Sequence, residues 1–156
     1  MTARGPSRSR RGRSASRELA LQALYQWQLG GQSGQDVLLE FLAERMSPGA
    51  DTEFFKELVM QATARCEELD AGLAEFSDRP VAQFDPVERS ILLIGAYELA
   101  HRPEVPWRVV INEAVELCRR YGSSEGHRFV NALLDRAARR YRPLETGAGG
   151  RANGEA

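Results

Sequence analysis

Apolar residues recur along most of the chain at the three- and four-residue spacing that is typical of amphipathic helices, and no segment alternates as a half-buried strand does. Ala20, Ala23, Leu24 and Trp27, for example, form one i, i+3, i+4, i+7 stripe that should face a core. The pattern therefore predicts an all-α fold, a single domain of about six to seven helices. Six of these helices are expected at residues 16–29, 35–46, 52–76, 86–102, 106–121 and 123–142.

The clearest helix start is the segment DPVE at residues 85–88. Asp85 can accept hydrogen bonds from the free amides of the first turn, and Pro86 fits the first helical position because it has no amide hydrogen. Glu88 stands where its carboxylate can reach back to the amide of the cap residue. At the two ends of the chain such signals are missing. We predict a disordered basic arm at residues 1–13, a helical domain at 14–143 and a disordered Gly/Ala-rich tail at 144–156.

Charge is distributed unevenly along the chain. The formal net charge is −1, but the first 17 residues contain six arginines and no acidic residue, which leaves about −7 for the rest. A separate arginine-rich segment is typical of proteins that bind nucleic acid. A solvated tail with no ligand would have the same composition, so charge alone leaves both interpretations open.

Several classes of protein are excluded. No run of eighteen apolar residues is present, so no transmembrane helix is expected. Glu18 and three glutamines interrupt the apolar segment after the arginines, which argues against a secretory signal. Cys66 and Cys118 lie in apolar periodic segments and predict buried thiols rather than a disulfide or a zinc site. These features favour a cytoplasmic protein.

No catalytic motif is recognisable. The sequence has no phosphate-binding glycine loop, no HExxH and no GxSxG, and its only histidines are His101 and His127. We therefore expect a binding protein rather than an enzyme, with no metal and no cofactor. RNA, duplex DNA bound by a helix-turn-helix, and a protein partner are the candidate ligands. The acidic residues of the fourth and fifth helices disfavour the DNA interpretation, and Tyr121 and Phe129 could stack on unpaired bases.

Three stretches of the sequence resemble the NusB family of bacterial transcription antitermination factors. They are SRELALQALYQWQL, VERSILLIGAYELAHRPEVPWRVVINEAVELCRRYG and HRFVNALLDRAA, and together the likeness extends from about Arg13 to Pro143. The resemblance implies two small packed helical bundles without catalytic activity. It also implies binding to the single-stranded boxA RNA of ribosomal-operon transcripts. The implied protein partner is the small-subunit ribosomal protein that serves as Nus factor E, and the pair acts on elongating RNA polymerase.

The same resemblance implies a set of site residues at the starts of the first and last helices. The implied RNA-binding residues are Arg10, Arg11, Arg13, Arg17, Gln22, Ser124, Glu125, His127, Arg128 and Phe129. Tyr25 and Glu88 are the implied contacts to the ribosomal protein. For each of these two residues there is an equal alternative: Tyr25 could pack in the core, and Glu88 could cap its helix. Glu125 repels phosphate, although a carboxylate can accept from the amino group of cytosine.

The chain departs from the family pattern in three places. Its basic arm is longer than usual, so Arg4 and Arg8 extend beyond the implied RNA contacts. Gly126 replaces a residue that often has a hydroxyl group, and Leu93 replaces a basic residue that some members have near the partner surface. Some relatives form homodimers, and the sequence is compatible with a monomer or a homodimer. The substrate-docking region of ribosomal-RNA cytosine methyltransferases is the alternative relative, but we expect no SAM-binding domain in a chain of 156 residues.

Overall fold

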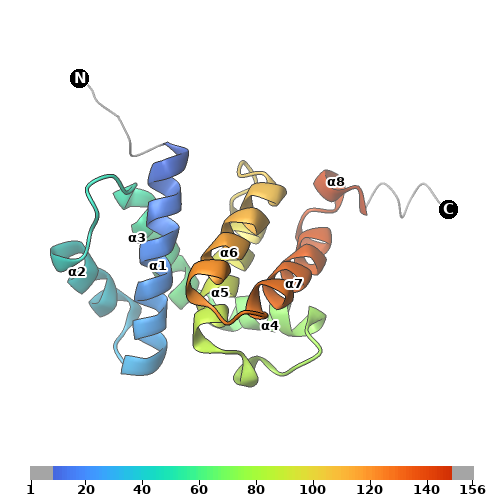
Figure 1. Ribbon diagram of the computed structural model, residues 1–156, viewed down its shortest axis with the longest axis horizontal. Helices are drawn as coiled ribbons and strands as arrows, with labels where there is room; N and C mark the ends of the chain where they lie inside the picture. Colours follow the sequence, from blue (N-terminus) through green and yellow to red (C-terminus); the bar gives the residue numbers. More distant parts are fainter. Residues whose placement is uncertain (1–8, 149–156) are drawn as a thin grey trace. The chain divides into compact units, whose positions relative to one another are not determined.

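The computed structural model describes residues 9–148, and this part of the chain is helical with no strand (Figure 1). The chain divides into two compact units, Met1–Cys66 and Glu67–Ala156. The all-α prediction is confirmed. The described range contains eight α-helices rather than six or seven, because one predicted helix is broken and a short one follows the last. None of the helices in this range is long and apolar enough to cross a membrane.

The first unit is a bundle of three helices. α1 (Arg10–Gly30), α2 (Gly34–Glu44) and α3 (Thr52–Ala64) each pack against the other two. Leu24, Phe41, Phe55 and Leu58 are fully buried, and the rings of Phe41 and Phe55 have centroids 6.0 Å apart. The predicted stripe on α1 faces this core, except that Trp27 is only half-buried.

α1 starts earlier than predicted. The expected start was Ser16, whereas the helix begins at Arg10 because the Ser9 hydroxyl accepts a hydrogen bond of 2.8 Å from the amide of Gly12. Residues 10–13, predicted as part of a disordered arm, are therefore helical, and the rest of that prediction, residues 1–8, lies outside the described residues. At the other end, Gly31 has a φ of +74° and ends the helix in the left-handed conformation, near the predicted point.

The predicted long helix over residues 52–76 is broken at Arg65. α3 ends at Ala64, and α4 (Cys66–Phe76) begins directly after the break. The Thr63 hydroxyl donates to the carbonyls of Val59 and Met60, at 2.9 and 3.2 Å. Such back-bonding bends helices. The hydrophobic periodicity continues through the break, and for this reason the sequence pattern did not reveal it.

The second unit is built around α5 (Pro86–His101), whose residues 90–99 are all buried. α6 (Trp107–Tyr121) and α7 (Gly126–Tyr141) pack against α5 and against each other. A 3₁₀ turn, Val81–Gln83, precedes α5, and the short α8 (Pro143–Thr146) follows α7. Residues 144–146 of the predicted disordered tail are therefore helical, and residues 149–156 lie outside the described residues. The predicted central position of the fourth helix is confirmed.

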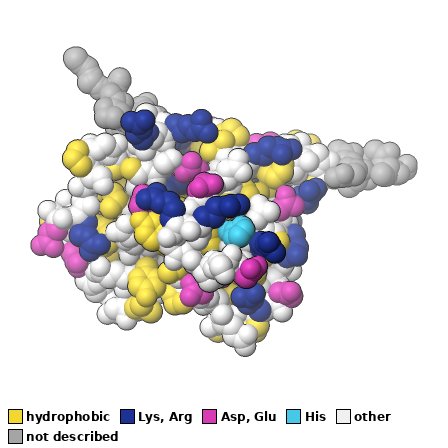
Figure 2. All heavy atoms as spheres, viewed as in Figure 1, with side chains coloured by type: hydrophobic (Ala, Val, Ile, Leu, Met, Phe, Trp, Pro, Cys, Tyr) yellow, Lys and Arg dark blue, Asp and Glu magenta, His cyan; other side chains and the backbone are white. Residues whose placement is uncertain are grey.

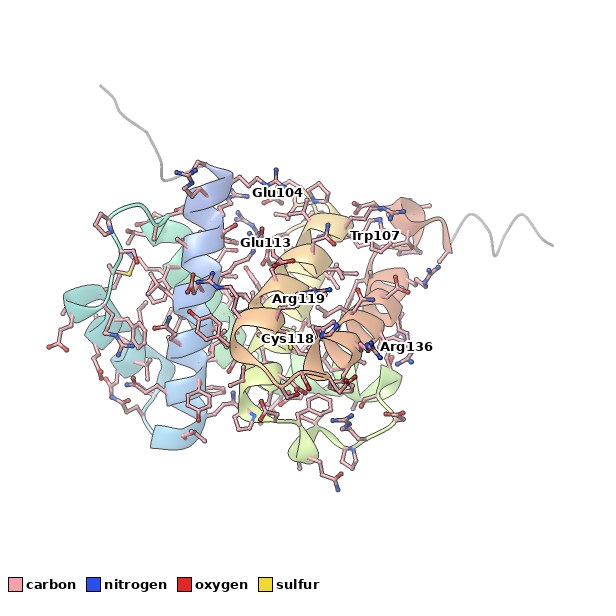
Figure 3. The ribbon with its side chains drawn as sticks, in the orientation of Figure 1. Glu104, Trp107, Glu113, Cys118, Arg119 and Arg136 are labelled. Carbon is pink, nitrogen blue, oxygen red and sulfur yellow. The ribbon has the colours of Figure 1, made fainter. Side chains whose placement is uncertain are left out.

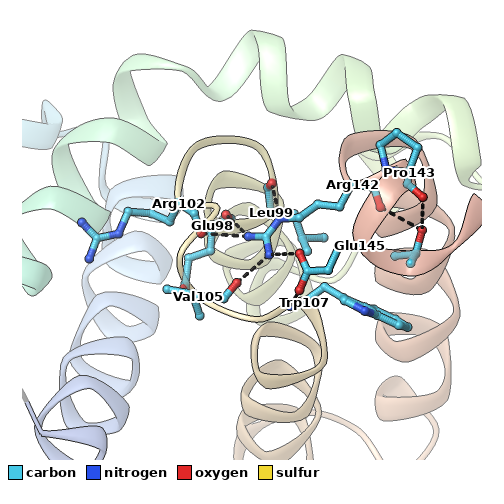
Figure 4. A network of polar contacts seen from close by, with 9 residues as sticks. Glu98, Leu99, Arg102, Val105, Trp107, Arg142, Pro143 and Glu145 are labelled. Atoms are coloured by element: carbon cyan, nitrogen blue, oxygen red, sulfur yellow. Dashed lines mark hydrogen bonds and ion pairs between the residues drawn. The ribbon is translucent and has the colours of Figure 1, made fainter. Parts of the chain in front are cut away.

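Arg142 closes one end of the second unit (Figure 4). Its side chain is buried and donates five hydrogen bonds, to the carbonyls of Glu98, Leu99, Arg102 and Val105 and to the carboxylate of Glu145. The last carbonyls of an α-helix have no partner within the helix. The Arg142 guanidinium supplies a partner to the Leu99 carbonyl, adds a second donor at Glu98, and fixes the chain between α7 and α8.

Candidate nucleic-acid interface

The amino end of α1 presents two arginines to solvent. Arg10 and Arg11 are both exposed, and the first turn of α1 contains no acidic residue. Free amides at a helix start favour a bound anion, and guanidinium groups are suited to phosphate. This end of the first unit is therefore an electropositive surface that can hold a phosphate backbone.

Arg13 and Arg17 are held differently from Arg10 and Arg11. Both guanidinium groups lie over the ring of Phe54, each 5.1 Å from its centroid, and Arg13 also pairs with Asp51 at 4.0 Å. Arg17 is only 3% exposed. The prediction that Arg17 offers an open phosphate contact therefore does not fit the structure, because its side chain packs against α3.

Asp51 fixes the start of α1 against α3. Its carboxylate accepts from the amide of Phe54 at 3.1 Å and so caps α3, while its carbonyl accepts from the buried Ser16 hydroxyl at 2.6 Å. The amide of Asp51 in turn donates to the carbonyl of Gly12. These bonds give the arginine-bearing turn of α1 a defined position on the first unit.

Two further predicted residues lie along α1. Gln22 is half-buried, and its side-chain oxygen accepts from Arg45 at 3.2 Å. Tyr25 is 40% exposed, so it is accessible to a partner as well as in contact with its own helix. Gln22 and Tyr25 are three residues apart and therefore neighbours on the helix surface.

The amino end of α7 carries the second predicted set. Ser124 and Glu125 are exposed before the helix, His127 is half-buried in its first turn, and Arg128 is exposed. Arg128 pairs with Glu125 at 3.6 Å, and both side chains are more than three-quarters exposed, at 77% and 76%. This set thus lies together on one turn of the second unit.

Phe129 is half-buried, with a guanidinium over its ring. The guanidinium of Arg79 lies 4.1 Å from the ring centroid, and the rings of Phe84 and Phe129 are in a T-shaped arrangement with centroids 5.3 Å apart. Phe129 is thus partly a core residue and partly a surface one. Sequence reasoning missed Arg79, which lies in the bend between α4 and the 3₁₀ turn and belongs to no motif.

Glu88 lies inside the second unit. Asp85 caps α5 as predicted, but the expected bond from Glu88 back to the cap does not form. The Glu88 carboxylate instead accepts from the Ser123 hydroxyl at 3.3 Å, and the residue is 5% exposed. Burial, and secondarily Asp85, raises the pKa of this carboxyl above its usual value, whereas Ser123 and Arg79 act in the opposite direction. Burial likewise raises the pKa of the Cys118 thiol, to about 11.

The predicted site residues thus form one group on each unit. In the first unit, α1 carries the arginines, Gln22 and Tyr25, and in the second unit, the turn before α7 and its first residues carry the rest, with Glu88 beneath them. Figure 2 shows basic side chains standing beside acidic ones on the molecular surface. Within residues 9–148 no group of three His, Cys, Asp or Glu side chains is placed to hold a metal ion.

A protein-family model described as the NusB family matches residues 14–139. The chain belongs to the NusB family. The transcription antitermination protein NusB of Nitrosococcus oceani is 49% identical over 133 residues, covering 85% of this chain and 89% of that protein. That of Xanthomonas campestris pv. campestris (strain B100) is 45% identical over 138 residues, covering 88% of this chain and 87% of that protein.

Solved NusB structures have the same fold. A crystal structure of the antitermination factors NusB and NusE in complex with dsRNA has a TM-score of 0.76 at 25% identity, covering 85% of this chain and 100% of that chain. T. maritima NusB has a TM-score of 0.75 at 26% identity, covering 86% of this chain and 96% of its own. NusB proteins are non-catalytic antitermination factors, so this chain is not an enzyme.

Proposed function

We propose that this NusB protein makes transcription resistant to termination by binding the single-stranded boxA RNA of ribosomal-operon transcripts. It binds the RNA together with NusE, the small-subunit ribosomal protein, and the complex acts on elongating RNA polymerase in the cytoplasm. Its relatives are named as antitermination proteins, and one structural neighbour is a NusB complex with NusE and dsRNA.

The observation that carries this proposal is the exposed arginine pair at the start of α1. Arg10 and Arg11 stand on a helix start whose first turn contains no acid to neutralise them. A cation at this end of a helix is unfavourable unless an anion lies opposite. RNA phosphates supply that anion, with Arg13 at the edge of the surface and Arg17 supporting the turn from below.

The turn at the start of α7 contacts the bases and the neighbouring phosphates. Ser124, His127 and Arg128 offer polar groups, and Phe129 offers a ring on which an unpaired base can stack after Arg79 moves aside. Glu125 tunes affinity through its pair with Arg128. Gln22 adds a polar contact from α1.

The partner surface includes the exposed side of α1 around Tyr25. This tyrosine combines a large contact area with a hydroxyl group, the type of residue that is enriched at protein interfaces. Glu88 is too deeply buried to contribute its carboxylate to that surface in the conformation described.

A filter-binding titration tests the proposal. Wild-type protein is titrated against boxA RNA, a scrambled single strand of equal length and an RNA duplex, each with and without NusE. We expect boxA RNA to bind more tightly than the scrambled strand and the duplex, and NusE to raise that affinity. Equal binding of all three RNAs, or no effect of NusE, would contradict the proposal.

A further inference from the structure

The carboxylate of Glu88 lies beneath the turn that leads into α7. Glu88 comes from the first turn of α5, and its carboxylate accepts a hydrogen bond from Ser123, in the loop before α7. It is 5% exposed. An acidic side chain is rarely buried without a specific partner, so its position under this turn calls for a structural explanation.

Gly126 allows the turn to approach that closely. A Cβ atom on Gly126 would overlap the Glu88 carboxylate and lie 3.1 Å from the sulfur of Cys118. The φ of Gly126 is not positive, so the glycine serves close contact rather than an unusual backbone conformation. Gly122, at the other end of the same loop, leaves room in the same way, because its Cβ would lie 2.8 Å from the Cys118 sulfur. Figure 3 labels Cys118 on α6 near the start of α7.

The start of α7 has no side-chain cap of its own. Glu125 occupies the cap position without a side-chain hydrogen bond to the helix. The turn is held by two backbone bonds, Gly126 to Ser123 at 3.1 Å and Arg128 to Glu125 at 3.2 Å, and by the Ser123–Glu88 contact. Glu88 therefore connects the turn to α5.

We propose that Glu88 is a positioning residue for RNA binding: it fixes the turn of residues 123–128 so that Glu125, His127 and Arg128 face the RNA. This inference rests on the proposed RNA-binding function. It assigns Glu88 an effect on RNA affinity that does not need the protein partner, and it explains why this chain has glycine at position 126.

Four single variants and one double variant test the inference, with RNA affinity measured without NusE. Glu88→Ala removes the support, and Glu88→Gln keeps an oxygen that can accept from Ser123. Gly126→Ala pushes against the carboxylate. Gly95→Ala is the matched control. Its added Cβ would lie 2.8 Å from the side chain of Leu134, which is also on α7 but in the core and away from the turn.

Amide hydrogen exchange at residues 123–128 and RNA affinity are the two readouts. We expect Glu88→Ala and Gly126→Ala each to speed exchange in the turn and to weaken RNA binding about fivefold, the size of one hydrogen bond. Glu88→Gln should retain both properties. Gly95→Ala should lower stability but leave RNA affinity unchanged. The double variant Glu88→Ala/Gly126→Ala should bind RNA nearly as well as Glu88→Ala alone, because the carboxylate that the added Cβ at position 126 would overlap is absent.

Two results would overturn the inference. One is a Glu88→Ala protein with normal exchange and normal RNA affinity; if a separate titration shows that this variant no longer binds NusE, Glu88 is a partner contact instead. The other is faster exchange without loss of RNA affinity. If wild-type protein binds no RNA, the proposed function fails. The exchange data then still decide whether Glu88 holds the turn.

Discussion

Single residues in this protein owe their roles to neighbours that are distant in sequence. Arg10, Arg11, Arg13 and Arg17 belong to one basic stretch, but only Arg10 and Arg11 are exposed, because Phe54 of α3 lies under the guanidinium groups of the other two. Composition predicted a basic surface at the start of this helix. It could not tell which arginines face solvent, since that depends on a ring from another helix.

Glu88→Gln should stabilise the protein at neutral pH. In the folded state the pKa of Glu88 is raised above its ordinary value of 4.5. The contribution of the Glu88 side chain to the free energy of unfolding is therefore fully present below pH 4.5 and is lost as the pH rises through the folded pKa, because the carboxylate is disfavoured by burial. Glutamine has no such loss. Thermal unfolding should therefore give a higher Tm for the variant at pH 7.5 and a difference that shrinks toward pH 4. A difference independent of pH would contradict this explanation.

Glu125→Gln should increase RNA affinity. The carboxylate pairs with Arg128 at 3.6 Å on the open surface, and such pairs are weak, so freeing the arginine should raise affinity by about two- to fivefold. A titration against boxA RNA at fixed salt measures the effect. A fall in affinity would mean that the carboxylate accepts a hydrogen bond from a base.

At the scale of elements, the start of α5 was predicted correctly and the break after α3 was not. Asp85 and Pro86 start α5 as the sequence indicates, because capping depends on adjacent residues. The break at Arg65 was missed, since the Thr63 hydroxyl that bends the helix leaves the apolar spacing intact. The network of Arg142 was missed too, because it joins segments that are far apart in the sequence.

Arg142→Lys should destabilise the second unit. Arginine makes five hydrogen bonds here, and lysine has only three donors. The loss of two bonds from a charged donor should cost about 3 kcal/mol in urea unfolding. Arg139→Lys is the control, because Arg139 is exposed and pairs with Asp135. This control variant should change the free energy of unfolding by less than about 0.5 kcal/mol. An equal loss of unfolding free energy in the two variants would show that the buried hydrogen bonds of Arg142 add little to stability.

At the scale of the whole molecule, family likeness supplied what periodicity could not. Hydrophobic spacing predicted helices, and net charge left the arginine-rich segment open to two interpretations. The match to the NusB family over residues 14–139 places the helical part of the chain that follows this segment in a family of antitermination factors. The positions of Arg79 and Glu88 came only from the structure, because both act through contacts within the folded second unit.

The salt dependence of RNA binding is the most direct test of the central claim. Wild-type protein and the Arg10→Ala/Arg11→Ala variant are titrated with boxA RNA over a range of salt concentrations. Arg139→Ala/Arg140→Ala is the matched control for net charge. Two lost phosphate contacts should make the slope of log K against log salt shallower by about 1.4. The control should match wild type, whereas an unchanged slope in the Arg10/Arg11 variant would contradict an RNA surface at the start of α1.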